Sequence, residues 1–143
     1  MRSKSRAAAI LLLVSAVALG WVVRAQAPKD ETKQERPSLS LRLSPRVGLA
    51  PLEVSATAEL QGGSDNFEEY YCATIEWDWD DGTRSESSGD CEPYDPNESE
   101  IRRRFTARHR YERGGRYRVV FNLKQNDEIV GRVVTTAQFN GGF

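Results

Sequence analysis

Residues 77–83 read Trp-Asp-Trp-Asp-Asp-Gly-Thr, and the rest of the chain is interpreted outward from this stretch. Across residues 73–79 apolar and polar side chains alternate, which places Trp77 and Trp79 on the same side. A period of two is typical of a half-buried strand, so both indoles are predicted to point into one core. The Asp81-Gly82 dipeptide tolerates the positive φ that a two-residue hairpin turn requires, and the chain is expected to reverse there.

The same alternation predicts strands elsewhere in the chain. The strand that ends at Trp79 is expected to begin at Phe67, and the others are expected near residues 39–43, 52–60, 101–111, 117–123 and 129–139. Residues 85–100 are rich in Ser, Gly, Asp and Pro, which indicates a long loop with a short edge strand. No segment after the N-terminal region has a helical period. The pattern predicts an all-β, immunoglobulin-like antiparallel sandwich of about seven strands.

Three motifs in the right order resemble the polycystic-kidney-disease (PKD) domain, an immunoglobulin-like sandwich family. Residues 77–83 resemble its W-D-F-G-D-G-T signature, with Trp79 in place of Phe and Asp80 in place of Gly. His109-Arg110-Tyr111 matches H-x-Y, residues 115–121 match G-x-Y-x-V-x-L except for a final Phe, and residues 48–54 resemble the entry G-x-A-P-L-x-V. The resemblance covers about residues 38–140 and implies that the matched positions are structural. These are Trp77, Asp78, Asp81, Gly82, Thr83, His109, Tyr111, Gly115, Tyr117 and Val119.

The N-terminal region has the form of a secretory signal. Arg2, Lys4 and Arg6 precede an uncharged stretch at residues 7–23, and a small residue follows at Ala25. We expect a signal peptide at residues 1–25, with an uncleaved membrane anchor as the alternative, then a flexible linker at 26–37 and the domain at 38–140. Either form places the domain outside the cytoplasm, either secreted or in the periplasm or at the cell surface.

Loss of the signal peptide would remove four basic residues and leave Lys+Arg at 16 against 21 acidic residues, a net charge of about −5. Nucleic acid is therefore not an expected partner. The two cysteines of an exported chain predict one disulfide, between Cys72 and Cys91, on the outer face or edge of the sheet. These residues are equally distant from the centre of the Asp81-Gly82 turn, so an uninterrupted hairpin would place them opposite one another.

Two groups of residues have side chains suited to metal binding or catalysis, and each also has a structural use. Asp78, Asp80 and Asp81 have oxygen ligands of the type that calcium prefers, but their spacing does not fit an EF-hand loop, and an Asp-Gly turn forms without an ion. His109 is the single histidine, and its position in the alternation turns it inward. We therefore expect no metal, no cofactor and no catalytic site, with calcium as the alternative.

Charge is distributed unevenly along the domain. Residues 59–100 contain 14 acidic residues and one basic residue, whereas residues 101–118 contain eight arginines and one acidic residue. The arginines of alternate positions, Arg102, Arg104, Arg108 and Arg110, form a possible binding face for an anionic partner. Neutralisation by acidic residues on neighbouring strands is the favoured interpretation.

The sequence thus predicts an exported, non-catalytic module that acts by binding or as a spacer. The resemblance implies adhesion-type contacts with protein or polysaccharide outside the cytoplasm. A calcium-dependent carbohydrate-binding module is the first alternative and an enzyme of unrecognised type is the second.

Overall fold

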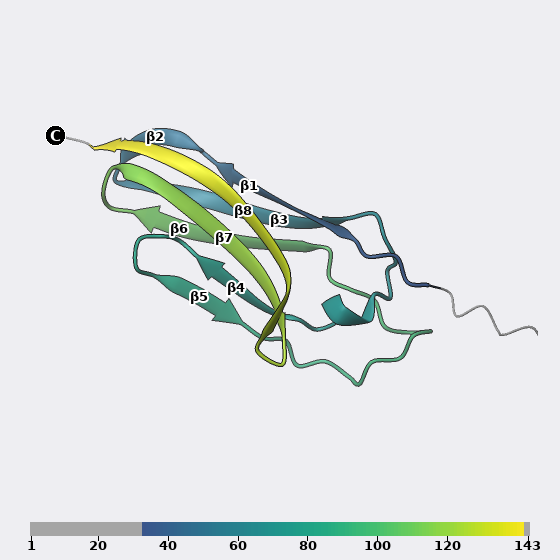
Figure 1. The fold of residues 1–143 in the computed structure, drawn as a ribbon. Helices are drawn as coiled ribbons and strands as arrows, with labels where there is room; N and C mark the ends of the chain where they lie inside the picture. Colours follow the sequence, from purple (N-terminus) through teal and green to yellow (C-terminus); the bar gives the residue numbers. More distant parts are fainter. Residues whose placement is uncertain (1–32, 142–143) are drawn as a thin grey trace, which may run out of the picture. The chain divides into compact units, whose positions relative to one another are not determined.

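Two facing β-sheets make up the domain in the computed structural model, which describes residues 33–141 (Figure 1). One sheet has three strands in the order β1-β3-β6, and the other has five in the order β2-β8-β7-β4-β5. The elements are β1 (Ser38–Ser44), β2 (Val47–Ala50), β3 (Leu52–Gln61), the 3₁₀ turn η1 (Glu68–Tyr70), β4 (Thr74–Asp78), β5 (Arg84–Ser87), β6 (Arg104–Tyr111), β7 (Gly115–Gln125) and β8 (Glu128–Gly141). The all-β prediction is confirmed, whereas the predicted signal peptide lies outside the described residues.

The core lies between the two sheets, because inward residues on each sheet are apolar at every second position. Alanines at inward positions of β3 leave room for rings from the neighbouring strands, and Phe105 on β6 packs against Phe121 on β7 with ring centroids 5.2 Å apart. Trp77 and Trp79 are both buried and stack at 5.5 Å with an interplanar angle of 8°. The inward prediction for both indoles is therefore confirmed. Tyr117, which was expected with them, is only half-buried.

The first half of the strand predicted from Phe67 to Trp79 is wrong. Residues 68–70 form a 3₁₀ turn, and β4 covers only Thr74–Asp78. Phe67 and Tyr70 are both buried and lie three positions apart, which is the period of a 3₁₀ helix and not of a strand. Cys72 then takes a left-handed φ of 51°, and the chain changes direction before β4 begins.

Two further features of the sheets differ from the prediction. The described residues contain eight strands, because β2 is an additional short edge strand. β2 also pairs with β8 in parallel, so the sandwich is not entirely antiparallel. Val47 and Leu49 on β2 are 70% and 65% exposed, and the small residues Gly48 and Ala50 take the inner positions. Apolar and polar residues therefore do not alternate along this strand, and the sequence pattern does not reveal it.

The reversal after β4 is wider than the predicted two-residue turn. In the β4–β5 ladder Asp78 pairs with Arg84, and the Trp79 amide donates to the carbonyl of Thr83 at 3.2 Å. This closure leaves Asp80, Asp81 and Gly82 at the tip, with φ values of 63° at Asp80 and 88° at Gly82. The left-handed backbone therefore falls at Asp80 and Gly82, and Asp80 holds a conformation that glycine adopts more easily.

Residues 26–37 were expected to be a flexible linker, and this is wrong for the last five of them. Gln34 Nε2 donates to Asn66 O at 2.8 Å, and Arg36 donates to Val130 O at 2.9 Å and also pairs with Glu69. Polar groups make these contacts, and Pro37 is buried as well, but residues 33–37 contain no large apolar side chain, which is why the sequence pattern did not reveal the attachment. The part of the prediction that concerns residues 26–32 lies outside the described residues.

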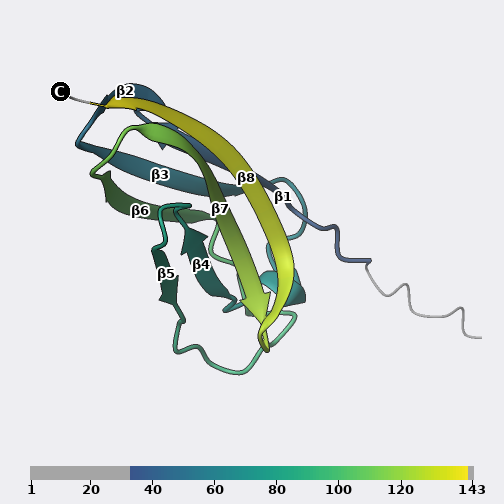
Figure 2. The same ribbon diagram turned by 60° about the vertical axis from the view of Figure 1, so that its left-hand side comes forward.

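The loops of the domain gather at two opposite ends (Figure 2). Residues 33–37, η1 and the loop after β5 lie at one end, and the tip of the β4–β5 hairpin lies at the other with the end of β8. Within residues 33–141 no helix has the length and apolar character needed to cross a membrane.

Candidate functional site

The tip of the β4–β5 hairpin is fastened to the opposite sheet by a histidine and an aspartate. Asp81 Oδ1 accepts hydrogen bonds from the amide and the hydroxyl of Thr83, at 3.1 and 2.5 Å. Its other oxygen lies 2.6 Å from His109 Nε2 on β6, and the His109 ring stacks on Trp79 at 4.5 Å. The His109 side chain is 17% exposed and turned inward, as its position in the alternation predicted. The motif at residues 77–83 and the His109-Arg110-Tyr111 motif are therefore in direct contact.

A second contact joins the same elements deeper in the core. The buried Tyr111 hydroxyl donates to the carbonyl of Trp79 at 2.9 Å. Burial, together with the nearby charge of Asp81, raises the pKa of Tyr111 above its ordinary value, so this phenol stays a neutral donor. Other matched positions have simpler structural uses. Val119 is buried in the core, and the Tyr117 hydroxyl donates to the carbonyl of Arg113 at 2.7 Å. A side chain at Gly115 would crowd the ring of Tyr117 at 3.3 Å.

The three aspartates proposed as calcium ligands are used by the turn itself. Asp78 pairs with Arg84 at 3.0 Å, and Asp80 accepts a hydrogen bond from the amide of Arg118 at 2.8 Å. Asp81 is occupied by Thr83 and His109. Residues 33–141 contain no group of three metal-ligating side chains placed to share one ion. The acidic character of the stretch is thus explained by hydrogen bonds within the hairpin and to β7.

The contact at Asp81 predicts a pH-dependent contribution to stability. Burial opposes ionisation of this carboxyl, but the hydrogen bonds from Thr83 and His109 outweigh it, so the pKa of Asp81 is held below its ordinary value. The contribution is therefore complete above the unfolded-state pKa of about 3.9 and is lost as the pH falls through the lower folded-state value. Asp81→Ala should lower the free energy of unfolding by about 1–3 kcal/mol at neutral pH, measured by denaturant titration.

A matched control for that variant is Glu112→Ala, which removes an exposed ion pair with Arg110 and should change stability by less than about 0.5 kcal/mol. The difference in free energy of unfolding between the parent and Asp81→Ala should become smaller in acid, below the pKa of Asp81 in the folded state. A neutral-pH cost no larger than that of the control would contradict the structural role of Asp81.

The arginines of the possible binding face have different surroundings. Arg104 pairs with Glu59 at 3.3 Å, and Arg110 pairs with Glu112 at 2.7 Å and lies opposite Glu53 in the β3–β6 register. Arg108 lies opposite Ser55, and no ion pair to it is found in the described part of the chain. Arg102 precedes β6, and its guanidinium lies over the ring of Phe105, a buried residue on the inner face of β6. The four residues therefore do not form one continuous cationic surface.

We predict that this face does not hold a polyanion at physiological salt, because carboxylates pair with two of its four arginines and exposed charges are screened beyond ~8 Å. The measurement is retention on heparin and alginate columns. Retention that disappears in the double variant Arg104→Ser, Arg108→Ser would contradict the prediction and assign a polyanion site to β6.

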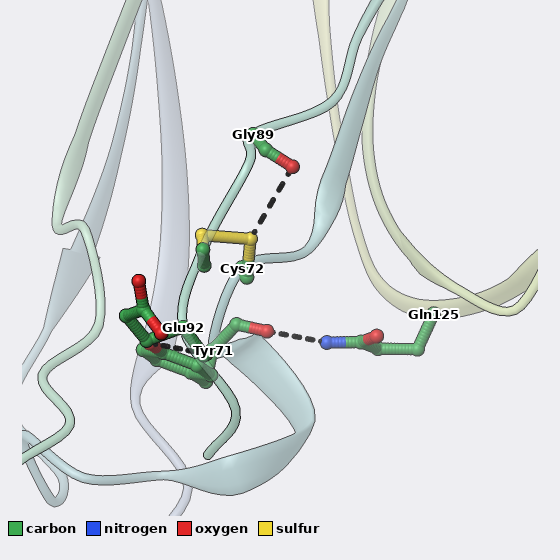
Figure 3. Close-up of a disulfide and its surroundings, with 6 residues drawn as sticks. Tyr71, Cys72, Gly89, Glu92 and Gln125 are labelled. Atoms are coloured by element: carbon green, nitrogen blue, oxygen red, sulfur yellow. Dashed lines mark hydrogen bonds between the residues drawn. A yellow bond between two sulfur atoms is a disulfide. The ribbon is translucent and has the colours of Figure 1, made fainter.

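The loop between β5 and β6 is fixed by a disulfide and by tyrosine hydroxyls (Figure 3). Cys72 and Cys91 are bonded, with their Cα atoms 6.1 Å apart, which confirms the predicted pairing. Tyr71 Oη donates to the carbonyl of Glu92 at 3.0 Å, and Tyr94 Oη donates to the carbonyl of Asn66 at 2.6 Å. The segment that composition marked as a long loop is thus tied to the sandwich at several points.

A groove lies beneath this loop, and no sequence pattern indicated it. Its cavity volume is about 220 Å³. Ala73, Ile75 and Phe105 line it with apolar surface, the disulfide also borders it, and Glu100 and Arg102 contribute charged groups. Because its walls come from β4, the loop and β6, no local pattern could have predicted it. It is one of several surface hollows, and the disulfide is part of its lining.

Neither the known protein-family models nor the curated proteins contain a match to this chain. Of the residues singled out by sequence, the structure brings together the hairpin tip, His109 and Tyr111, and separately the two cysteines. Sequence reasoning did not detect the attachment of Gln34 and Arg36 to the domain, and it did not detect the groove.

Proposed function

We propose that the chain is an exported, non-catalytic PKD-like module that contacts protein or polysaccharide outside the cytoplasm. The observation that carries this proposal is the contact of Asp81 with Thr83 and His109. It gives the matched signature positions a structural use, which is what a PKD-like sandwich requires of them. The disulfide supports an oxidising compartment, because such bonds are rare in reducing cytosol.

The environment of the reactive side chains supports a role without catalysis. His109 is held by Asp81 and stacked on Trp79, and the Tyr111 hydroxyl is committed to a backbone carbonyl. A general base or nucleophile would have to reach a substrate from a concave site, and these groups are instead used to connect the two sheets. The role that we propose is therefore binding through surface contacts.

The proposal is tested with the full chain after export in a bacterial host. Exposure to protease in intact cells should show the domain outside the cytoplasm, and mass spectrometry should show the disulfide formed. The immobilised protein is then offered an extracytoplasmic extract and a glycan array, with crosslinking to identify what it touches. Saturable capture of a defined protein or glycan is expected, and Trp77→Ala, which damages the core, is the control for folded structure.

Two results would overturn this function. One is a chain that remains in the cytoplasm with both thiols reduced. The other is turnover of a substrate by the purified protein, since a binding or spacer module has no catalytic step.

A further inference from the structure

The groove beneath the β5–β6 loop has an apolar floor with a cation at its mouth. Ile75 on β4 and Phe105 on β6 belong to opposite sheets, so the floor lies where the sandwich is open along its side. The guanidinium of Arg102 lies 4.9 Å from the centroid of the Phe105 ring. The charged and the apolar parts of the groove are therefore adjacent, within the span of one amino-acid residue.

The size of the groove limits what it can hold. Its volume of about 220 Å³ is above the ~150 Å³ of an apolar cavity that accepts benzene. It is below the ~300–1,000 Å³ of pockets that enclose a drug-sized ligand. One aromatic or branched aliphatic side chain fits these limits, and an oligosaccharide does not.

Arg102 is available to a ligand. Its Nε donates to the carbonyl of Arg104 at 3.0 Å, and no ion pair to its guanidinium is found within residues 33–141. Glu100 also lines the groove without pairing to it, and its charge disfavours a ligand with several negative groups. A single carboxylate can bind an arginine with two parallel hydrogen bonds. The groove thus favours an apolar group that carries one carboxylate.

Resting on the proposed binding function, we propose that this groove captures the carboxyl-terminal apolar residue of a partner polypeptide. That residue carries an apolar side chain and a free carboxylate close together, as the spacing of Phe105 and Arg102 requires. A free small acid would gain only the contacts of one buried group. A polypeptide gains more, because the neighbouring β5 is an edge strand with all its residues exposed and can pair with an extended segment.

The disulfide is part of this site because it lines the groove. Gly89 lies against it: a side-chain Cβ there would be 3.3 Å from each sulfur. Reduction would release Cys91 and the adjoining loop from Cys72, so it should weaken binding as well as stability.

The test uses the exported full chain, isotopically labelled for NMR, and a short peptide, Ala-Ser-Ala-Ser-Phe, with a free carboxyl terminus. Saturable shifts are expected at the amides of Ala73, Ile75, Gly89 and Arg102. The same peptide ending in a carboxamide should bind at least about tenfold more weakly, because a charge-assisted contact is lost. Arg102→Gln should have the same effect, and Arg108→Gln, on the outer face of β6, should have none.

Several outcomes would overturn the proposal. They are equal binding of the acid and the carboxamide, shifts confined to other surfaces, or no shifts at about 1 mM peptide, which would mean an affinity too weak to matter. N-acetylphenylalanine binding as tightly as the peptide would show a small-acid site and contradict a polypeptide ligand. If a partner is captured from extract equally well by Arg102→Gln and by the parent, the proposed function survives and this inference fails.

Discussion

Trp77→Ala should lower the free energy of unfolding by about 3–5 kcal/mol, the largest loss that we expect from a single substitution. Trp77 is 3% exposed, lies 4.5 Å from Phe121 between ring centroids, and stacks on Trp79. Alanine would leave a cavity on the inner face of the five-stranded sheet, and its neighbours are held by strand pairing and cannot collapse into it fully. The melting temperature should fall by more than about 10 °C.

Calorimetry or thermal circular dichroism measures this effect, and Val47→Ala is the matched control. Val47 is an apolar residue of the same sheet but is 70% exposed, so its truncation should cost less than about 0.5 kcal/mol. If both variants melted within a few degrees of the parent, the central position of Trp77 in the core would be wrong.

The period of two along the strands was sufficient to predict the all-β class and the inward side of each long strand. It works because the inner face of each of these strands is apolar, although β7 also buries Val120 and Asn122 on its other face, and the register of the pairs then follows. The signal fails where apolar and polar residues do not alternate. The short strand β2 exposes Val47 and Leu49, and the 3₁₀ turn buries Phe67 and Tyr70 three positions apart.

Contacts between distant segments were not predictable from sequence. Arg36 reaches Val130, and Gln34 reaches the Tyr94 hydroxyl at 2.7 Å, through side chains that look solvated in a one-dimensional pattern. The pairing of His109 with Asp81 was missed for the same reason, although the inward direction of His109 was predicted. The type of a polar residue does not identify its hydrogen-bond partner, because hydrogen bonding depends on position in space and not on spacing along the chain.

The disulfide shows how a correct pairing can follow from an incorrect register. The prediction centred the hairpin between Asp81 and Gly82, whereas the ladder pairs Trp77 with Ser85 and so centres it on Asp81. Regular pairing also stops at Ile75 and Ser87, before either cysteine. The left-handed residue Cys72 and the loop at Gly89 bring the sulfurs together outside the ladder. The number of cysteines, which predicted one disulfide, did not depend on the register.

Breaking this disulfide should produce the second large loss of stability, about 3 kcal/mol by the chain-entropy relation for cysteines separated by 19 residues in sequence. The loss should be local before it is global. The hydroxyl contacts of Tyr71 with Glu92 and of Tyr94 with Asn66 do not depend on the bond. The end of the β4–β5 ladder next to the bond, where Ile75 pairs with Ser87, should therefore lose amide protection first, while Tyr94 and the rest of the sandwich stay closed.

Hydrogen exchange and thermal melting of the exported chain, with and without reductant, measure the local and the global loss of stability. The double variant Cys72→Ser, Cys91→Ser is the control, because it lacks the bond and so separates loss of the bond from side effects of the reductant. The variant treated with reductant should melt where the untreated variant does. Intact mass spectrometry that finds two free thiols in the exported chain would refute the bond. An unchanged melting temperature after full reduction would refute its role, because the entropy of the closed loop would then contribute nothing to the stability of the fold.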